Sequence, residues 1–282
     1  MVDWLAKLES LDRRWLYGGT VLVLLVPFVV AIPMPPGGAT PATQGLYDRV
    51  ESCPGDKVVL VDSSWDMGSR AENQAQLECV VRHLCRRRVR FVVTSIGVSK
   101  FAPEFAARVI EPIAAKAGYV YGRDWANLGF VEARGGMGAV VDGLCRDLHS
   151  VRPTDVKGTP VGELPLLDDV RSIQDVHLVY CITYAPVPEW ISFVKGQHGT
   201  PVAFGSMSIM SPQYYTYLDS GQLCGMLAGN RGAAEYEALD GHPSLGTRLI
   251  MAASFGNCVI IVAALLGNVG AWAVRRRRRA GK

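Results

Sequence analysis

Two long uncharged stretches constrain this chain more than any other feature of its sequence. One runs from residue 16 to 32, LYGGTVLVLLVPFVVAI, and the other from residue 249 to 274, LIMAASFGNCVIIVAALLGNVGAWAV. A bilayer core is spanned by about 20 apolar residues in a helix, and both stretches approach or exceed that length. The sequence therefore predicts two transmembrane helices, at residues 16–33 and 249–274, with Pro27 inside the first.

A cleaved signal peptide is the alternative for the first stretch. Against cleavage, the arm of residues 1–15 carries acidic as well as basic side chains, and no small-x-small site follows the apolar run. The chain instead continues into prolines at positions 33, 35 and 36. We therefore expect a retained membrane anchor.

The distribution of arginines predicts the orientation. Positively charged residues flank membrane helices on the cytoplasmic side, and both predicted helices carry theirs at the chain ends. Arg248 opposes this arrangement, because it is a single positive charge at the other end of the second helix. Both termini, the arm 1–15 and the basic tail 275–282, are thus expected in the cytoplasm, with the intervening domain outside. The residues expected to contact lipid headgroups are Arg275, Arg276, Arg277, Arg278 and Arg279.

The charge of the central region differs from that of the whole chain. Residues 34–247 contain 19 Lys and Arg and 23 Asp and Glu, a net charge of −4, whereas the full chain is at +3. Nucleic-acid binding depends on basic side chains that neutralise phosphates. We therefore expect the bilayer, and no nucleic acid, as a partner.

The central region alternates strand-like and helix-like patterns. Residues 34–44 form a Pro/Gly linker, and residues 45–247 form the extracytoplasmic domain. Such alternation predicts a parallel sheet covered by helices on both faces, and a long connection between the third and fourth strands is where a doubly wound sheet reverses. The fold class is α/β, a Rossmann-like doubly wound parallel sheet of about five strands. These strands are expected near residues 57–62, 89–96, 127–131, 176–183 and 202–205.

Two local patterns sharpen these boundaries. Ser69 and Glu72 have the spacing of a capping box, which predicts a helix that starts after Ser69. Residues 221–232, GQLCGMLAGNRG, are glycine-rich and apolar. We expect a loop there, followed by a last helix from about residue 231 to 239.

A metal-binding loop is one interpretation of the residues after the first strand. The segment from Asp62 to Asp66, DSSWD, partly resembles the metal loop of von Willebrand factor A domains, with Asp62 and Ser64 in place and Asp66 where that family has a serine. Oxygen ligands of this kind suit Mg²⁺ or Ca²⁺. The alternative is a polar turn whose side chains accept hydrogen bonds from backbone amides. We favour the turn and expect no bound metal.

Other candidate motifs lack the surroundings that their chemistry needs. The glycines of residues 134–138, RGGMG, could hold an anion at a helix N-terminus, but we favour a tight turn as the explanation. Ser206 lacks the G-x-S-x-G frame of a nucleophilic serine, and the five histidines show no ligand spacing. We expect no catalytic site and no cofactor, and hence no enzyme.

Small residues recur along the second apolar stretch. Their four-residue spacing lets helix backbones approach closely, and two asparagines in lipid favour a polar contact with another helix. The predicted helix–helix contact residues are Ala252, Gly256, Asn257, Ala263, Gly267, Asn268 and Ala271. Aromatic residues are enriched at protein interfaces, so Tyr214, Tyr215 and Tyr217 are candidates for protein contact, with core packing as the alternative.

Six cysteines fall in the predicted outer domain. In an oxidising compartment they could pair, although free thiols also pack as small apolar side chains. Disulfide formation stays open, and Cys53 is the first place to look for it. The six are Cys53, Cys79, Cys85, Cys145, Cys181 and Cys224.

The overall layout resembles a group of uncharacterised bacterial membrane proteins. The resemblance rests on the arm ending in residues 11–14, LDRR, the segment 232–236, GAAEY, and the basic end after the last helix. It implies an inner-membrane location with a periplasmic domain and no assigned activity. The expected role is a structural or accessory subunit of a membrane complex, as a homo-oligomer or with other membrane subunits. The alternative is a ligand-binding or sensory domain that uses the crevice at the strand ends.

Overall fold

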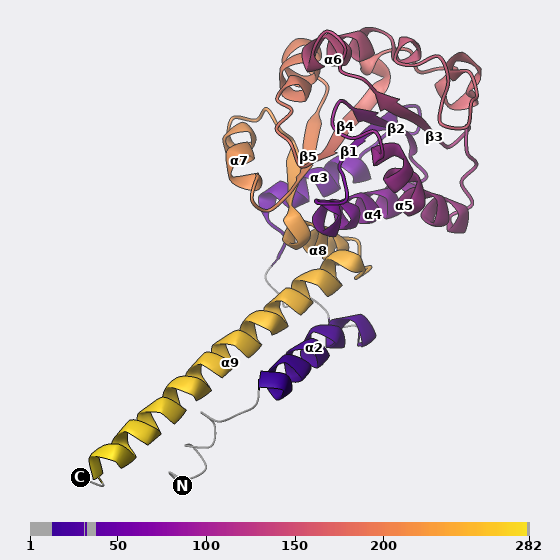
Figure 1. The fold of residues 1–282 in the computed structure, drawn as a ribbon. Coiled ribbons are helices and arrows are strands. Elements are labelled where there is room, and N and C mark those ends of the chain that lie inside the picture. The colour runs from indigo at the N-terminus through magenta and orange to yellow at the C-terminus, as the bar shows by residue number, and fades with distance from the viewer. Residues whose placement is uncertain (1–12, 31, 33–37, 281–282) are drawn as a thin grey trace. The chain divides into compact units, whose positions relative to one another are not determined.

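The computed structural model describes residues 13–30, 32 and 38–280. Two compact units make up the chain. Pro35–Thr247 forms one unit, and Met1–Met34 together with Arg248–Lys282 forms the other (Figure 1). The domain expected at residues 45–247 thus begins nearer to the first apolar segment than the sequence indicates.

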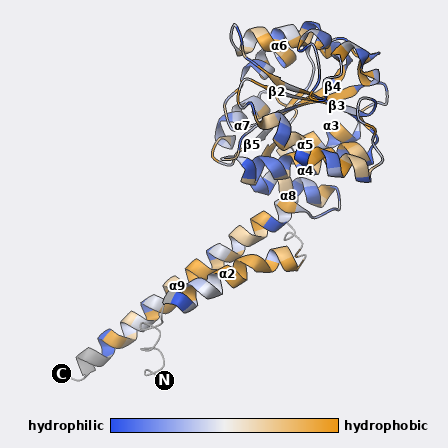
Figure 2. Cartoon of the chain, turned by 45° about the vertical axis from the view of Figure 1, so that its right-hand side comes forward, coloured by the Kyte–Doolittle hydropathy of each residue, from blue (hydrophilic) through white to orange (hydrophobic). Residues whose placement is uncertain are grey.

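The terminal segments contain the two apolar helices, α2 (Arg13–Val29) and α9 (Leu245–Ala280). Over the 32 residues Leu245–Arg276, α9 is long and apolar enough to cross a membrane, in agreement with the predicted second transmembrane helix. The apolar part of α2, Arg14–Val29, is shorter than a crossing helix. The structure therefore does not support the transmembrane helix predicted at residues 16–33, of which residues 31 and 33 lie outside the described residues. Figure 2 shows the hydrophobic residues of α2 and α9 in orange.

The domain is built on a parallel sheet of six strands, where about five were expected. Their spatial order is β3-β2-β1-β4-β5-β6, the order of a doubly wound Rossmann-type sheet. The predicted reversal between the third and fourth strands is confirmed, because the chain crosses from the β3 edge to a place beside β1. The strands are β1 (Val58–Ser64), β2 (Arg90–Ile96), β3 (Trp125–Val131), β4 (Val176–Thr183), β5 (Val202–Ser206) and β6 (Gly225–Ala228).

Helices cover the sheet as two layers. Helices α4 and α5 pack against each other and the sheet, and α8 packs against α4 and α3 (Figure 1). On the other face, α6, the π-helix η6 and α7 enclose an apolar core with the strands. The bounds are α3 (Pro41–Glu51), α4 (Arg70–Arg86), α5 (Ala102–Lys116), α6 (Met137–Arg146), η6 (Trp190–Gln197), α7 (Ser211–Asp219) and α8 (Gly229–Leu239), with 3₁₀ turns at Leu148–Ser150, Val161–Glu163, Pro165–Leu167 and Ile173–Asp175 in the crossover.

The sixth strand lies in the segment predicted to be a loop. A side chain at Gly225 would place its Cβ 2.3 Å from the backbone nitrogen of Leu46, and one at Gly45 would place it 2.2 Å from the carbonyl oxygen of Cys224. These glycines let α3 approach β6 at backbone distance. The loop prediction is wrong because glycine also serves close packing of backbone against backbone. Likewise, α3 starts at Pro41, inside the predicted linker 34–44, with Thr40 as its N-cap.

Candidate functional site

Asp62 lies at the carboxyl end of β1, beside β4, where the sheet reverses. The side chain is fully buried. Its Oδ1 accepts hydrogen bonds from Ser64 Oγ at 2.7 Å and the Ile96 amide at 3.1 Å. Its Oδ2 accepts from Cys181 Sγ at 3.2 Å and Trp190 Nε1 at 3.1 Å. Burial raises the pKa of Asp62 to about 6, although these donors favour the charged form.

The three candidate metal residues, Asp62, Ser64 and Asp66, have different hydrogen-bond partners. Asp62 and Ser64 bond to each other, whereas Asp66 Oδ1 accepts from the amides of Gly68 at 2.8 Å and Ser69 at 3.2 Å. Within the described part of the chain, no three His, Cys, Asp or Glu side chains are grouped to hold a metal ion. The arrangement is that of a polar turn whose carboxylate caps backbone amides.

The capping box predicted at the start of α4 is wrong. Ser69 makes no side-chain bond to the helix amides. Glu72 Oε2 instead accepts from the amide and hydroxyl of Ser208, at 2.6 and 3.0 Å. The glutamate thereby connects α4 to the segment after β5.

The ends of β5 and β6 are closed by buried polar contacts. Ser206 Oγ pairs with Ser211 Oγ at 2.8 Å rather than with a histidine. Gln76 of α4 is fully buried, and its Nε2 donates to the carbonyl oxygens of Ser206, Leu227 and Gly229 at 2.8, 3.2 and 3.2 Å. Side chains of the domain itself thus take up hydrogen-bonding groups where a doubly wound sheet would bind a ligand.

The glycine motif before α6 forms a tight turn. Gly135 and Gly136 have φ values of 77° and 97°, in the left-handed region that glycine adopts without strain. Gly136 is the N-cap of α6, and its place there follows from backbone conformation alone.

Two buried glutamates of α8 form further networks of polar contacts. Glu235 Oε2 accepts from the Thr40 amide at 2.9 Å, the Thr40 hydroxyl at 2.8 Å and the Thr43 hydroxyl at 2.9 Å. Arg231 Nε donates to the other oxygen at 2.9 Å. Burial alone would raise the pKa of Glu235, but the Thr40, Arg231 and Thr43 bonds hold it below its usual value. Glu235 therefore fixes the start of α3.

Glu237 does the same for the start of α9. Its Oε1 accepts from the Gly246 amide at 2.8 Å. Its Oε2 accepts from the amides of Ser244 at 2.7 Å and Thr247 at 2.9 Å, and from the Thr247 hydroxyl at 2.6 Å. The first amides of a helix have no partners within it, so a carboxylate at this place caps the helix. A Cβ at Gly246 would lie 2.8 Å from Ala233 Cβ, which shows how closely this first turn packs on α8.

The pair was not identified as a site from the sequence. Residues 235 and 237 are two positions apart and point to roughly opposite sides of a helix at 3.6 residues per turn. Both can be buried only when the helix is packed on both sides, as α8 is by α3 and the first turn of α9. In the sequence, the pair is indicated by two acidic residues within a segment of otherwise small and apolar residues, 232–239, GAAEYEAL.

Tyr236, between the two glutamates, belongs to a third buried contact. Its hydroxyl lies 2.7 Å from His83 Nδ1, and His83 Nε2 lies 2.6 Å from Glu51 Oε2. The ring of His83 stacks on Tyr47 at 4.5 Å. Burial lowers the pKa of His83, against the opposing effect of Glu51. His83 and Tyr236 are both fully buried and the Glu51 side chain is 39% exposed, so the contacts Glu51–His83–Tyr236 join α3, α4 and α8 from the surface into the core.

The predicted helix-contact residues of α9 lie in varied surroundings. A Cβ at Gly256 would be 3.1 Å from Leu24 Cδ2 of α2, so this glycine stands at a close approach of the two helices. Ala263 lines a cavity of about 280 Å³ that Leu16 and Val23 of α2 also line. The others are partly buried or exposed: Ala252 and Ala271 are half-buried, and Asn257, Gly267 and Asn268 are exposed.

The tyrosine candidates separate into core and surface. Tyr214 is buried and stacks on Phe204 with ring centroids 4.8 Å apart, so it packs in the core. Tyr217 is half-buried against the same core. Tyr215 is 44% exposed and lines a cavity of about 440 Å³ with the start of α3. Arg275 and Arg276, in the basic tail, are exposed.

All cysteines in the described residues are free thiols. Burial raises the pKa of Cys53 and of Cys224 to about 11, and that of Cys85 and Cys145 to about 12. Such thiols are protonated at neutral pH and poorly nucleophilic. No bridge links Cys53 to another cysteine.

Comparison with known proteins gives no match: neither a family model, nor a curated protein, nor a solved structure is similar to this chain. The resemblance to uncharacterised bacterial membrane proteins stays a prediction.

Proposed function

We propose that the chain is a membrane-anchored accessory subunit whose outer α/β domain makes protein contacts within a membrane complex. The observation that carries this proposal is the pair Glu235 and Glu237. Through them α8 holds the start of α3, which follows the first apolar segment of the chain. It also holds the first turn of α9, the helix that contains the second apolar segment. A domain that holds the first and last segments of its own fold through buried carboxylates suits a structural role. The occupied hydrogen-bonding groups at the strand ends favour this role over small-molecule binding.

The proposed topology has two crossings, both termini in the cytoplasm and the domain on the periplasmic side. At 1.5 Å per residue the 17 residues of α2 extend about 25 Å, a few ångströms short of a bilayer core of about 30 Å. Local thinning of the bilayer accommodates a mismatch of this size at modest cost. The run of arginines at the end of α9 supports the orientation.

Assembly with copies or other membrane subunits would use two surfaces. On α9, Asn268 and Gly267 are exposed within a helix that is mostly apolar, and a polar side chain in lipid is stabilised by a partner helix. On the domain, exposed Tyr215 borders the cavity lined by Pro41, Leu218 and other residues, which gives an aromatic contact of the kind enriched at interfaces.

The test is the mass of the particle extracted from its native membrane in lipid nanodiscs, measured by native mass spectrometry. We expect an assembly larger than one chain, which Tyr215→Glu reduces. Val120→Glu is the matched control, because Val120 is 48% exposed, close to the 44% of Tyr215. A single chain in the wild-type particle would refute the proposed function.

A further inference from the structure

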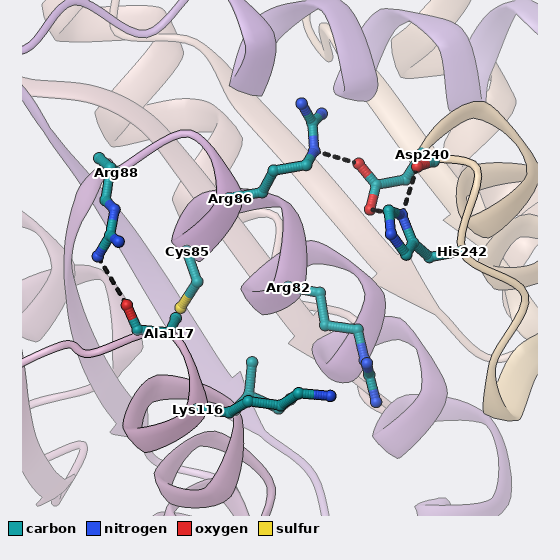
Figure 3. A pocket seen from close by; sticks show the side chains of 9 residues that line it. Arg82, Cys85, Arg86, Arg88, Lys116, Ala117, Asp240 and His242 are labelled. Atoms are coloured by element: carbon teal, nitrogen blue, oxygen red, sulfur yellow. Dashed lines mark hydrogen bonds and ion pairs between the residues drawn. The ribbon is translucent and has the colours of Figure 1, made fainter.

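A basic cavity of about 360 Å³ lies where the ends of α4 and α5 meet the residues that follow α8 (Figure 3). Four cationic side chains line it: Arg82, Arg86, Arg88 and Lys116. Asp240 is the one carboxylate among the lining residues. The size falls within the range of small-molecule sites, about 300–1,000 Å³.

Only part of this positive charge is neutralised by the protein. Arg86 bonds to Asp240 at 2.8 Å and to Glu51 at 3.0 Å, so its charge is paired. Arg88 Nη1 donates to the Ala117 carbonyl at 2.7 Å, which satisfies a donor but cancels no charge. Lys116 has no ion pair or hydrogen bond among the residues that the structure describes.

Arg82 is the one of the four cations with a buried donor atom that lacks a partner among the described residues. Its Nη2 bonds to Glu78 Oε1 at 2.9 Å, but its Nε is buried and has no partner in the described part of the chain. The same Glu78 oxygen also accepts from Ser244 Oγ at 2.6 Å, so its negative charge is shared. A buried N–H without an acceptor is costly, and a turn of the 39% exposed side chain toward a bound anion would remove that cost.

Basic residues near helix ends have an ordinary explanation, since they balance the partial negative charge of a helix C-terminus. This accounts for Lys116 in the last turn of α5 and for Arg88 on the Ala117 carbonyl. It does not account for the unpartnered Nε of Arg82 or for the hollow between the cations. Nor does it explain why they gather in a domain whose net charge is −4.

An adjoining cavity of about 370 Å³ extends the basic one along the α4–α5 crevice. The two share Arg82, Ile113 and Lys116, and the second adds Val109 and Pro112. A mixed surface, apolar at Val109 and Pro112 and polar at Gln74, Glu78 and Arg108, therefore continues from the cationic end. This combination suits an anion that carries an apolar or neutral portion.

We propose that the basic cavity binds the phosphate group of a phosphomonoester or phosphodiester, with Arg82, Arg88 and Lys116 as its ligands. Guanidinium groups suit phosphate because their N–H donors match its oxygens in pairs. The phosphate could belong to a soluble ester or to a lipid headgroup, because both present the same oxygens. The site is separate from the strand ends and from the Tyr215 surface, so it is independent of the proposed function.

The experiment measures how fast the Lys116 amine is acylated in the full chain reconstituted in nanodiscs of a neutral galactolipid, which contains no phosphate. Glycerol 3-phosphate is titrated into one set, and a second set contains phosphatidylglycerol and no soluble phosphate. Acylation of Lys100, 75% exposed and 3.9 Å from its nearest acid, is the internal control in each sample. A bound phosphate should slow acylation of Lys116 and leave Lys100 unchanged.

Variants then separate a site from a general charge effect. Arg82→Gln and Arg88→Asn should weaken protection of Lys116 by about tenfold or more, as expected for loss of a charged hydrogen bond. Asn is chosen because Arg88 has a φ of 59°, which Asn tolerates. Arg134→Gln, which removes a cation of 87% exposure elsewhere, should leave protection unchanged.

Each outcome of the acylation experiment either supports or overturns the proposed phosphate site. Protection by glycerol 3-phosphate in neutral discs supports a soluble ester as the ligand, and protection in anionic discs alone supports a lipid headgroup. The proposal is overturned if Lys116 reacts equally in all discs. It is equally overturned if Arg82→Gln and Arg134→Gln are protected to the same extent.

Discussion

Replacing Glu237 tests whether a carboxylate of the domain holds the first turn of α9. In Glu237→Ala the amides of Gly246 and Thr247, both buried, lose their acceptor. An unsatisfied buried donor costs about 1–3 kcal/mol, so two of them lower the free energy of unfolding of the domain by about 4 kcal/mol. In Glu237→Gln the amide oxygen can keep the Oε2 contacts and only the Gly246 bond is lost, at about 1–2 kcal/mol.

The assay is urea unfolding of the full chain in detergent, followed by the near-UV signal of the buried Trp65 and Trp190. Hydrogen exchange at the Gly246 and Thr247 amides gives a local readout, and we expect it to speed up by about a hundredfold in Glu237→Ala. Glu104→Gln is the control, because Glu104 is exposed and its pairing with Arg108 contributes less than about 1 kcal/mol. If Glu237→Ala matches this control in both measurements, the capping role is refuted.

Three further predictions concern buried groups of the domain. The folded-state pKa of Asp62, about 6, lies above the unfolded value of 3.8, so the folded state binds the proton more tightly. The unfolding free energy of wild type minus that of Asp62→Asn should therefore fall by about 2 kcal/mol as pH rises from 4 to 7; a pH-independent difference in urea titrations would contradict this. The pKa of His83 is lowered by burial, so its stabilising effect is present above pH 6.5 and is lost as pH falls through its folded-state pKa. Thermal unfolding of wild type and His83→Gln between pH 7 and 5 should show the wild type losing relative stability, and parallel curves would count against it. Gly225→Ala should destabilise by about 3 kcal/mol because its Cβ meets Leu46 at 2.3 Å, whereas Gly143→Ala, with open space around it, should not; equal urea midpoints would disprove the close packing.

Local patterns in the sequence predicted most of the sheet. Residues 176–183 were expected as a strand and form β4 over the same residues, because an apolar run covered on both faces is a strong local signal. The alternation of strands and helices, with a long third crossover, also predicted the reversal that places β4 beside β1. These features depend on neighbours in sequence.

The features that the sequence analysis missed depend on contacts far apart in the chain. Glu72 has the local spacing of a capping residue, but Ser208, 136 residues away, supplies its partners. Gly225 looks like a loop residue until Leu46 of α3 is seen against it. Glu237 is an ordinary helix acid by sequence, and its role appears only when the first turn of α9 is brought to α8.

The candidate metal residues also depend on contacts with distant parts of the chain. The sequence shows that Asp62 and Ser64 are polar residues at the end of a strand. It does not show that Trp190 and Cys181 donate hydrogen bonds to the second carboxylate oxygen of Asp62. Those donors come from β4 and η6, more than a hundred residues later in the chain. Composition around Asp62 carries no information about them.

Labelling with a membrane-impermeant maleimide tests the proposed membrane topology, with an outward-facing domain, most directly. The chain would carry Cys224→Ser and Cys258→Ser, with one new cysteine at exposed Lys100 or, in a second variant, at Lys282 of the basic tail. We predict that intact spheroplasts label the Lys100→Cys variant, and that Lys282→Cys reacts only after the membrane is permeabilised. Labelling of Lys282→Cys in intact spheroplasts, with Lys100→Cys protected, would contradict the proposed topology and the accessory role built on it.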